Sequence, residues 1–249
     1  MDISIETSIG NVRKENQDYS DFFVNTEGLY LLVLCDGMGG HQGGDIASQM
    51  AVNQLGHAWK SDSLSTAQEA LQWLEKHLQI ENERIYKTSM DFDDLKGMGT
   101  TIVAAIFIDG QCVIASVGDS RAYLLQDGML KQVTEDDTFV NELVKKGEIS
   151  KEEALQHPKR NILIQSLGVN ESLDVHKSKH AFFLNDLLVL ASDGLYEGVS
   201  ADDMLEVLQD DLLSLEDKTK KLTAIALRNY GKDNITVCLA QLKEGEVID

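Results

Sequence analysis

The chain has 249 residues, 43 % of them apolar and 26 % charged, and its 42 acidic against 22 basic side chains give a formal net charge of −20 at pH 7. This is the composition of a water-soluble globular protein with one large domain or two small ones. The acidic excess excludes nucleic-acid binding, which needs a basic surface, and disfavours an anionic membrane. The first residues lack the parts of a secretory signal, and no apolar run reaches the roughly 20 residues of a membrane span. We therefore expect a cytoplasmic protein without membrane insertion.

Short segments rich in aliphatic, β-branched or aromatic residues, each bounded by turn residues, predict strands. They cover residues 3–7, 19–24, 30–35, 101–108, 111–117, 122–126, 187–192 and 235–242. The Asp-Gly pairs at 109–110 and 127–128 predict tight hairpin turns, because that dipeptide readily adopts positive φ.

Apolar residues at helical spacing predict a long helix over 67–85 and another after the glycine cluster, over 46–58. Shorter helices are predicted over 138–146, 151–156, 201–209 and 217–229. Because the strands follow one another in hairpins and do not alternate strictly with helices, the pattern favours an α+β fold. We expect antiparallel sheets with helices packed outside them, in a single domain.

The three cysteines, Cys35, Cys112 and Cys238, each lie inside an apolar, strand-like run. Their odd number and the lack of a C-x-x-C spacing argue against a disulfide framework or a zinc site. We expect buried, reduced thiols.

Four aspartates stand at strand boundaries, each followed directly by glycine, serine or asparagine: Asp36, Asp119, Asp193 and Asp233. A carboxylate at the end of a buried strand is partly desolvated, which is costly unless it is paired. Several of them converging on one spot would make an all-oxygen site for Mg²⁺ or Mn²⁺. The alternative for each one alone is a helix cap or a turn.

Five glycines between residues 37 and 44 suggest a phosphate-binding loop, but neither G-K-[ST] nor G-x-G-x-x-G accompanies them. The chain also lacks G-x-S-x-G and H-E-x-x-H. Nucleotide-binding P-loop, serine hydrolase and zincin functions therefore find no support.

Five stretches occur in a telling order: R-K-E-N-Q-D at 13–18, D-G-M-G-G-H at 36–41, G-T-T at 99–101 with G-D-S-R at 118–121, S-D-G at 192–194, and D-N-I-T at 233–236. With them the chain resembles the metal-dependent Ser/Thr protein phosphatases of the PPM (PP2C) family, in their compact bacterial form. The resemblance covers residues 3–242. It implies a four-layer αββα sandwich of two antiparallel sheets flanked by helices, with a flap subdomain around 134–168.

The resemblance also implies the site residues. Asp36 would bridge two Mn²⁺ or Mg²⁺ ions, and the Gly37 carbonyl would bind one of them. Asp193 and Asp233 would complete the other. Asp18 would act through water, and Asp119 would hold a third ion.

The implied reaction is hydrolysis of phosphoserine and phosphothreonine by a metal-activated water at a binuclear centre. Arg13 would bind the substrate phosphate. His41 is the candidate general acid, and a structural histidine is the alternative. The implied partners are phosphorylated proteins, with a Ser/Thr kinase whose action the enzyme opposes, and we expect a monomer.

Two positions depart from the family. Many bacterial relatives have D-H-S where this chain has Asp136-Asp137-Thr138, so an aspartate replaces the histidine. Tyr230-Gly231 replaces the G-G before the last ligand. Because the metal ligands are intact, these changes leave the reaction in place and put substrate preference and flap behaviour in doubt. A catalytically silent protein of the same fold and a hydrolase of small phosphate esters stay open as alternatives.

Overall fold

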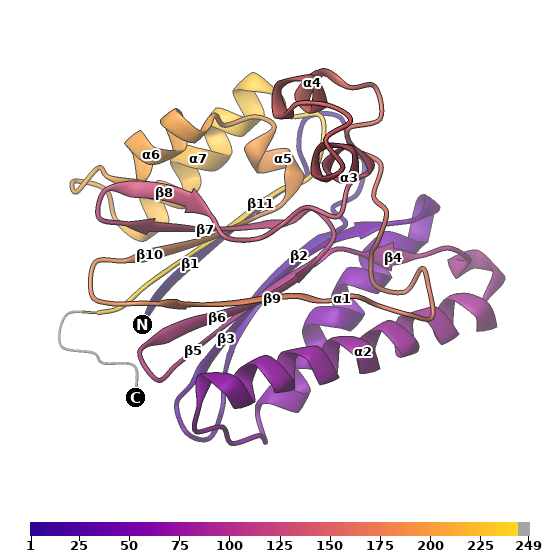
Figure 1. Ribbon diagram of the computed structural model, residues 1–249, viewed down its shortest axis with the longest axis horizontal. Helices are drawn as coiled ribbons and strands as arrows, with labels where there is room; N and C mark the ends of the chain where they lie inside the picture. Colours follow the sequence, from indigo (N-terminus) through magenta and orange to yellow (C-terminus); the bar gives the residue numbers. More distant parts are fainter. Residues whose placement is uncertain (244–249) are drawn as a thin grey trace.

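The structure, a computed structural model, describes residues 1–243 apart from the side chains of residues 40–42. Within these residues, two antiparallel sheets pack face to face and helices cover both outer faces (Figure 1). The predicted α+β sandwich of four layers is confirmed. In this part of the chain, no helix is long and apolar enough to cross a membrane.

The first sheet has the strand order β1-β11-β10-β7-β8. These strands span Asp2–Ser8, Ile235–Gln241, Leu187–Ala191, Arg121–Gln126 and Met129–Gln132. Helices α5 (Asp193–Tyr196), α6 (Ala201–Leu208) and α7 (Leu215–Asn229) lie on its outer face (Figure 1).

The second sheet has the order β2-β3-β5-β6-β9, with β4 paired to the end of β3. The strands β2, β3, β4, β5, β6 and β9 span Asp18–Val24, Tyr30–Met38, Gly99–Thr100, Ile102–Ile108, Gln111–Val117 and His176–Ala181. The long helices α1 (Gly40–Trp59) and α2 (Ala67–Asp91) cover its outer face, and the 3₁₀ turn η1 (Asp93–Leu95) follows α2. Helices α3 (Phe139–Lys145) and α4 (Lys151–Gln156) lie together at one end of the sandwich (Figure 1).

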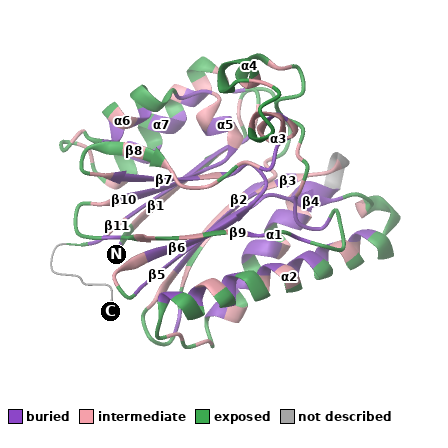
Figure 2. Ribbon diagram, in the orientation of Figure 1, coloured by how far each residue is buried: buried purple, intermediate pink, exposed green. Residues whose placement is uncertain are grey.

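The side-chain alternation of the strands builds the layers. On β3, Leu31 and Val33 pack against α1 and α2, whereas Leu32 and Leu34 pack against the other sheet. Strands buried on both faces are therefore continuously apolar, and in Figure 2 the buried residues concentrate in the middle layers. Cys35, Cys112 and Cys238 are free and buried there, as predicted.

The glycine cluster differs from the expected loop, because α1 already begins at Gly40. Its first turns lie against β3: a Cβ on Gly37 would stand 2.0 Å from the carbonyl oxygen of Gly44. Because Gly37 and Gly44 have no Cβ, the first turns of α1 can lie against the end of β3. The glycine cluster therefore includes the start of α1.

Candidate metal centre

Asp18 and Asp36 lie side by side at one end of the second sheet, because the β2–β3 register pairs them directly. Thr101 holds the backbone of Asp36 from the other side. Its N–H donates to the Asp36 carbonyl over 2.8 Å, and its hydroxyl accepts from the Asp36 N–H over 3.0 Å. The Thr101 hydroxyl also lies 2.7 Å from that of Ser120, next to Asp119. The G-T-T stretch thus connects two of the predicted ligands.

The first sheet brings Asp193 and Asp233 to the same end of the sandwich. Asp193 is the first residue of α5 and follows β10 after one intervening residue. Asp233 lies two positions before β11, the strand that pairs with β10. Ser192 joins the two sheets, since its hydroxyl donates to Asp18 Oδ2 over 2.8 Å and accepts from the Thr236 N–H over 2.9 Å. The S-D-G stretch contains Ser192, but the sequence pattern alone predicts no role for it.

Asn234 is a second residue without a predicted role that organises the site. Its Nδ2 donates to the carbonyls of Ile9 and Glu15, each over 3.0 Å, and its Oδ1 accepts from the Gln17 N–H over 2.9 Å. These bonds fasten the loop before β2, which carries Arg13, to the loop that carries Asp233. The D-N-I-T stretch contained Asn234, but only the fold shows what its amide holds.

Asp119 occupies the turn between β6 and β7, directly after Gly118, and it is buried. The Tyr196 hydroxyl donates to its backbone carbonyl over 3.1 Å. Burial, with a smaller contribution from the carboxylate of Asp136, raises the pKa of Asp119 to about 7.

The predicted ligands lie near enough to one another for their charges to interact. Burial, and next the carboxylates of Asp18 and Asp193, raise the pKa of Asp36 well above its ordinary value. The pKa of Asp193 is likewise well above its ordinary value, first through burial and then through Asp119 and Asp233. Burial raises the pKa of Asp18 to about 6. Like charges held near one another, away from water, disfavour the ionised form of each carboxylate.

Two oxygen atoms of the cluster, Oδ1 of Asp18 and Oδ1 of Asp193, are buried without a hydrogen-bond partner. Unpaired buried carboxylate oxygens are costly, and a divalent cation would satisfy them. In the described part of the chain, no group of three or more His, Cys, Asp or Glu side chains is arranged closely enough to hold a metal ion as it stands. The donor set nevertheless fits a hard cation, since it consists of carboxylate and carbonyl oxygens, with Gly37 at the end of β3 beside Asp36.

Arg13 supplies the positive charge of the site. Its Nη2 lies 2.6 Å from Oδ2 of Asp233, and half of its side chain is exposed. That hydrogen bond raises the pKa of the guanidinium, with smaller contributions from Asp193 and Asp36. Arg13 thus stands between the carboxylate cluster and solvent.

The remaining predicted residue, His41, lies in the first turn of α1, but its side chain falls outside what the structure describes. Its role as general acid stays a prediction.

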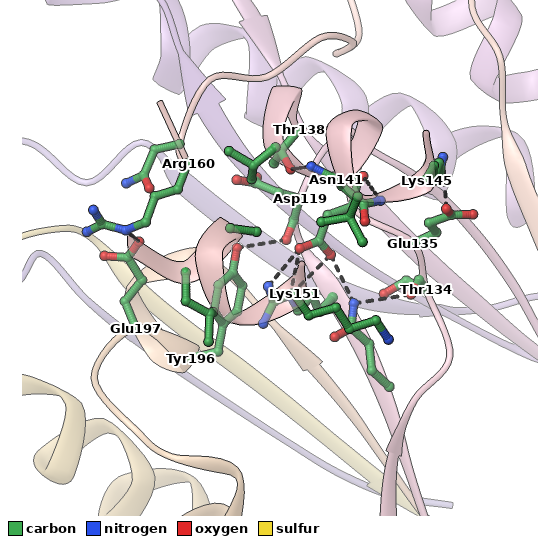
Figure 3. A pocket seen from close by; sticks show the side chains of 18 of the residues that line it. Asp119, Thr134, Glu135, Thr138, Asn141, Lys145, Lys151, Arg160, Tyr196 and Glu197 are labelled. Carbon is green, nitrogen blue, oxygen red and sulfur yellow. Dashed lines mark hydrogen bonds and ion pairs between the residues drawn. The ribbon is translucent and has the colours of Figure 1, made fainter. Parts of the chain in front are cut away.

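A cavity of about 840 Å³ opens beside Asp119 (Figure 3). One wall consists of residues 134–161, including α3 and α4, and the other of Tyr196, Glu197 and Tyr230. Arg121 lies between them, with its Nη2 2.7 Å from Oδ2 of Asp136 and its guanidinium 3.6 Å from the centre of the Tyr196 ring. Because Asp119 lines this cavity, the cavity lies alongside the carboxylate cluster.

Comparison with known proteins identifies the family of the chain. A family model described as protein phosphatase 2C matches residues 11–228. The serine/threonine phosphatase stp of Listeria monocytogenes is 44 % identical over 242 residues, which are 97 % of this chain and 96 % of that protein.

Solved structures of serine/threonine phosphatases share the fold of this chain. The Streptococcus agalactiae serine/threonine phosphatase superposes with a TM-score of 0.93 at 40 % identity, over 97 % of this chain and 99 % of that one. The catalytic domain of PstP, a serine threonine protein phosphatase in complex with 2 manganese ions, superposes with a TM-score of 0.84 at 33 % identity, over 96 % and 97 % of the two chains.

Proposed function

Since the chain belongs to the protein phosphatase 2C family, it is a metal-dependent serine/threonine protein phosphatase, and we propose which of its residues bind the metal and the phosphate. The protein acts on phosphoserine and phosphothreonine in proteins. One observation carries the proposal: buried carboxylates from both sheets lie near one another, and two of their own oxygen atoms have no hydrogen-bond partner.

The metal ligands are Asp36 and the Gly37 carbonyl, together with Asp193 and Asp233, which hold two Mn²⁺ or Mg²⁺ ions. Asp18 acts through water. The convergence of these groups at one end of the sandwich supports this assignment. Divalent cations bound there supply Lewis-acid activation of water and neutralise charge on the phosphoryl group.

Asp119 holds a third ion. Its burial beside Asp193, with its pKa raised to about 7, supports this, because a buried carboxylate next to others is relieved by a cation. The 134–168 segment forms a flap at this side of the site, and the cavity beside Asp119 lies beneath it.

Arg13 binds the substrate phosphate. Its guanidinium is held at the cluster by Asp233 and is half exposed, so it can donate to a phosphate without being brought from elsewhere. A guanidinium matches phosphate oxygens in a two-pronged hydrogen bond, which orients the ester.

The enzyme opposes a Ser/Thr kinase and works as a cytoplasmic monomer. The three free, buried thiols support a reducing compartment. Every proposed ligand comes from one chain, so one copy suffices for the site.

Hydrolysis of a generic aryl phosphate tests the metal assignment. Turnover should need added Mn²⁺, stop with chelator and disappear in Asp36→Asn. Asp21→Asn, which removes a carboxylate from the same sheet outside the cluster, should behave as wild type. If wild type turns over no faster than Asp36→Asn, the assignment fails.

Arg13→Ala tests the phosphate site. Loss of a charge-assisted hydrogen bond worth about 1.5–3 kcal/mol should lower kcat/KM by roughly 10- to 100-fold, mainly through a higher KM. Lys14→Ala, which removes the neighbouring exposed cation, is the matched control. Unchanged KM and kcat in Arg13→Ala would rule out the phosphate role.

A further inference from the structure

Asp137 is buried against the turn that carries Asp119. Its carboxylate Oδ2 accepts a hydrogen bond from the Gly118 N–H over 2.9 Å. Its own N–H donates to the Gly118 carbonyl, also over 2.9 Å. One residue thus engages both backbone groups of the glycine that precedes Asp119.

The Gly118 carbonyl belongs to the peptide bond that leads into Asp119, so the Asp137 N–H sets the plane from which the Asp119 side chain departs. The turn has a demanding geometry: Gly118 has a φ of +95°, and a Cβ there would lie 2.7 Å from Cγ2 of Thr101. A conformation outside the usual regions persists only where its surroundings hold it.

His176 in turn orients the Asp137 carboxylate. It is the first residue of β9, and its Nε2 lies 2.8 Å from Oδ1 of Asp137. Gln165 adds a longer contact of 3.3 Å from its Nε2 to Oδ2. The register of β9 pairs His176 with Ser116, two residues before Gly118. The carboxylate is therefore fixed on both oxygens.

The neighbouring Asp136 holds the other side of the turn. It binds Arg121, two residues after Asp119, through both the Nε and Nη2 atoms of the guanidinium. Two consecutive aspartates at the start of the 134–168 segment therefore enclose Asp119 from its two sides along the chain.

From this arrangement we infer that Asp137, held in place by His176, is a positioning residue that keeps the Gly118–Asp119 turn in the conformation in which Asp119 binds metal. This rests on the proposed role of Asp119 as a ligand of the third ion. It makes the base of the 134–168 segment part of that metal site, so a change in this segment alters metal occupancy at Asp119.

Calorimetric titration of the metal-free protein with Mn²⁺ tests the inference without relying on activity. Asp137→Ala should raise the Kd of the weakest Mn²⁺ site by about tenfold, as expected for a loss of about 1.4 kcal/mol, and leave the tighter sites unchanged. Asp137→Asn keeps an acceptor for the Gly118 N–H and should restore most of the affinity. His176→Ala, at a partly exposed position, should weaken the site by a smaller factor and serves if Asp137→Ala folds poorly.

Asp119→Ala, alone and combined with Asp137→Ala, completes a double-mutant cycle. It should abolish the weakest site, and adding Asp137→Ala to it should change the titration no further. Asp186→Ala is the matched control, because Asp186 also accepts a backbone N–H in a turn, that of Phe183, and belongs to none of the proposed metal ligands.

The outcomes separate the two ideas. If Asp119→Ala removes the weakest site while Asp137→Ala and His176→Ala leave it at wild-type affinity, the positioning role is wrong and the metal assignment survives. If Asp119→Ala leaves every Mn²⁺ site intact, the third-ion assignment is wrong and the positioning role falls with it.

Discussion

Replacing Asp18 by asparagine should stabilise the metal-free protein while weakening its response to metal. Asp18 is buried, its Oδ1 has no hydrogen-bond partner, and Asp36 lies directly opposite it in the β2–β3 register. Asparagine keeps an acceptor for the Ser192 hydroxyl, and its Nδ2 can donate to Asp36, where two carboxylates otherwise repel each other. The substitution removes a buried charge with little change of shape.

The magnitude follows from the pKa of Asp18, which burial raises from 3.8 to about 6. The folded, metal-free protein thus binds this proton more tightly than the unfolded chain does, so its stability falls as pH rises from about 4 to 6 and then stays level. At about 1.4 kcal/mol per pKa unit, the charged form costs about 3 kcal/mol above pH 6. Asp18→Asn avoids this cost. For a chain of this size, the melting temperature should rise by at most about 6–12 °C.

Thermal unfolding of Asp18→Asn and wild type, each in chelator and in excess Mn²⁺, provides the assay. In chelator at pH 8, the variant should melt above wild type. At pH 5 the gain should shrink to about half, because wild-type Asp18 then carries its proton. In Mn²⁺ the order should reverse, since ligand stabilisation scales with affinity. Asp21→Asn, on the same strand, should follow wild type throughout. A variant that melts below wild type in chelator at pH 8, or a gain that is the same at pH 5, would refute this reasoning.

Because burial raises the pKa of Asp18 to about 6 and that of Asp119 to about 7, Mn²⁺ must displace protons from these carboxylates near those pH values. Its Kd should therefore fall between pH 6 and 8, and calorimetry in buffers of different ionisation enthalpy should record proton release; a pH-independent Kd would contradict this. Gly37→Ala should unfold the protein or abolish activity, because its Cβ would stand 2.0 Å from the Gly44 oxygen, whereas wild-type melting and turnover would show that α1 can shift. With a net charge of −20, the enzyme should hydrolyse phosphopeptides with basic flanks faster than acidic ones at low salt, and equal rates would disprove steering by charge.

The strands in the middle of the sandwich could be predicted because local sequence and tertiary environment agree there. The predicted strand 111–117 has the bounds of β6, and the hairpin turns contain Asp109 and Asp127 at φ values of 54° and 50°. A strand buried on both faces must be apolar, so composition alone identifies it.

The sequence fails to predict strands where pairing with a neighbouring strand, and not local composition, makes the segment extended. β9 reads H-K-S-K-H-A, which is too polar for a predicted strand, yet it pairs with the free edge of β6. The helix predicted over 46–58 starts too late, since α1 begins at Gly40. The glycines inside α1 are explained only by the contact of Gly44 with the end of β3, which the sequence does not reveal. Sequence patterns carry no information about such partners.

The sequence by itself determined which carboxylates we propose as metal ligands, their order and the chemistry they favour, because carboxylates at strand ends beside glycine are a local pattern. Only the tertiary structure decided which groups hold those ligands. Ser192 joins Asp18 to the other sheet, Asn234 ties the Arg13 loop to Asp233, and Asp137 reaches the turn before Asp119. These contacts join residues that are 174, 217 and 19 positions apart. A hydrogen bond depends on the position and direction of both partners, which are set only when the chain folds.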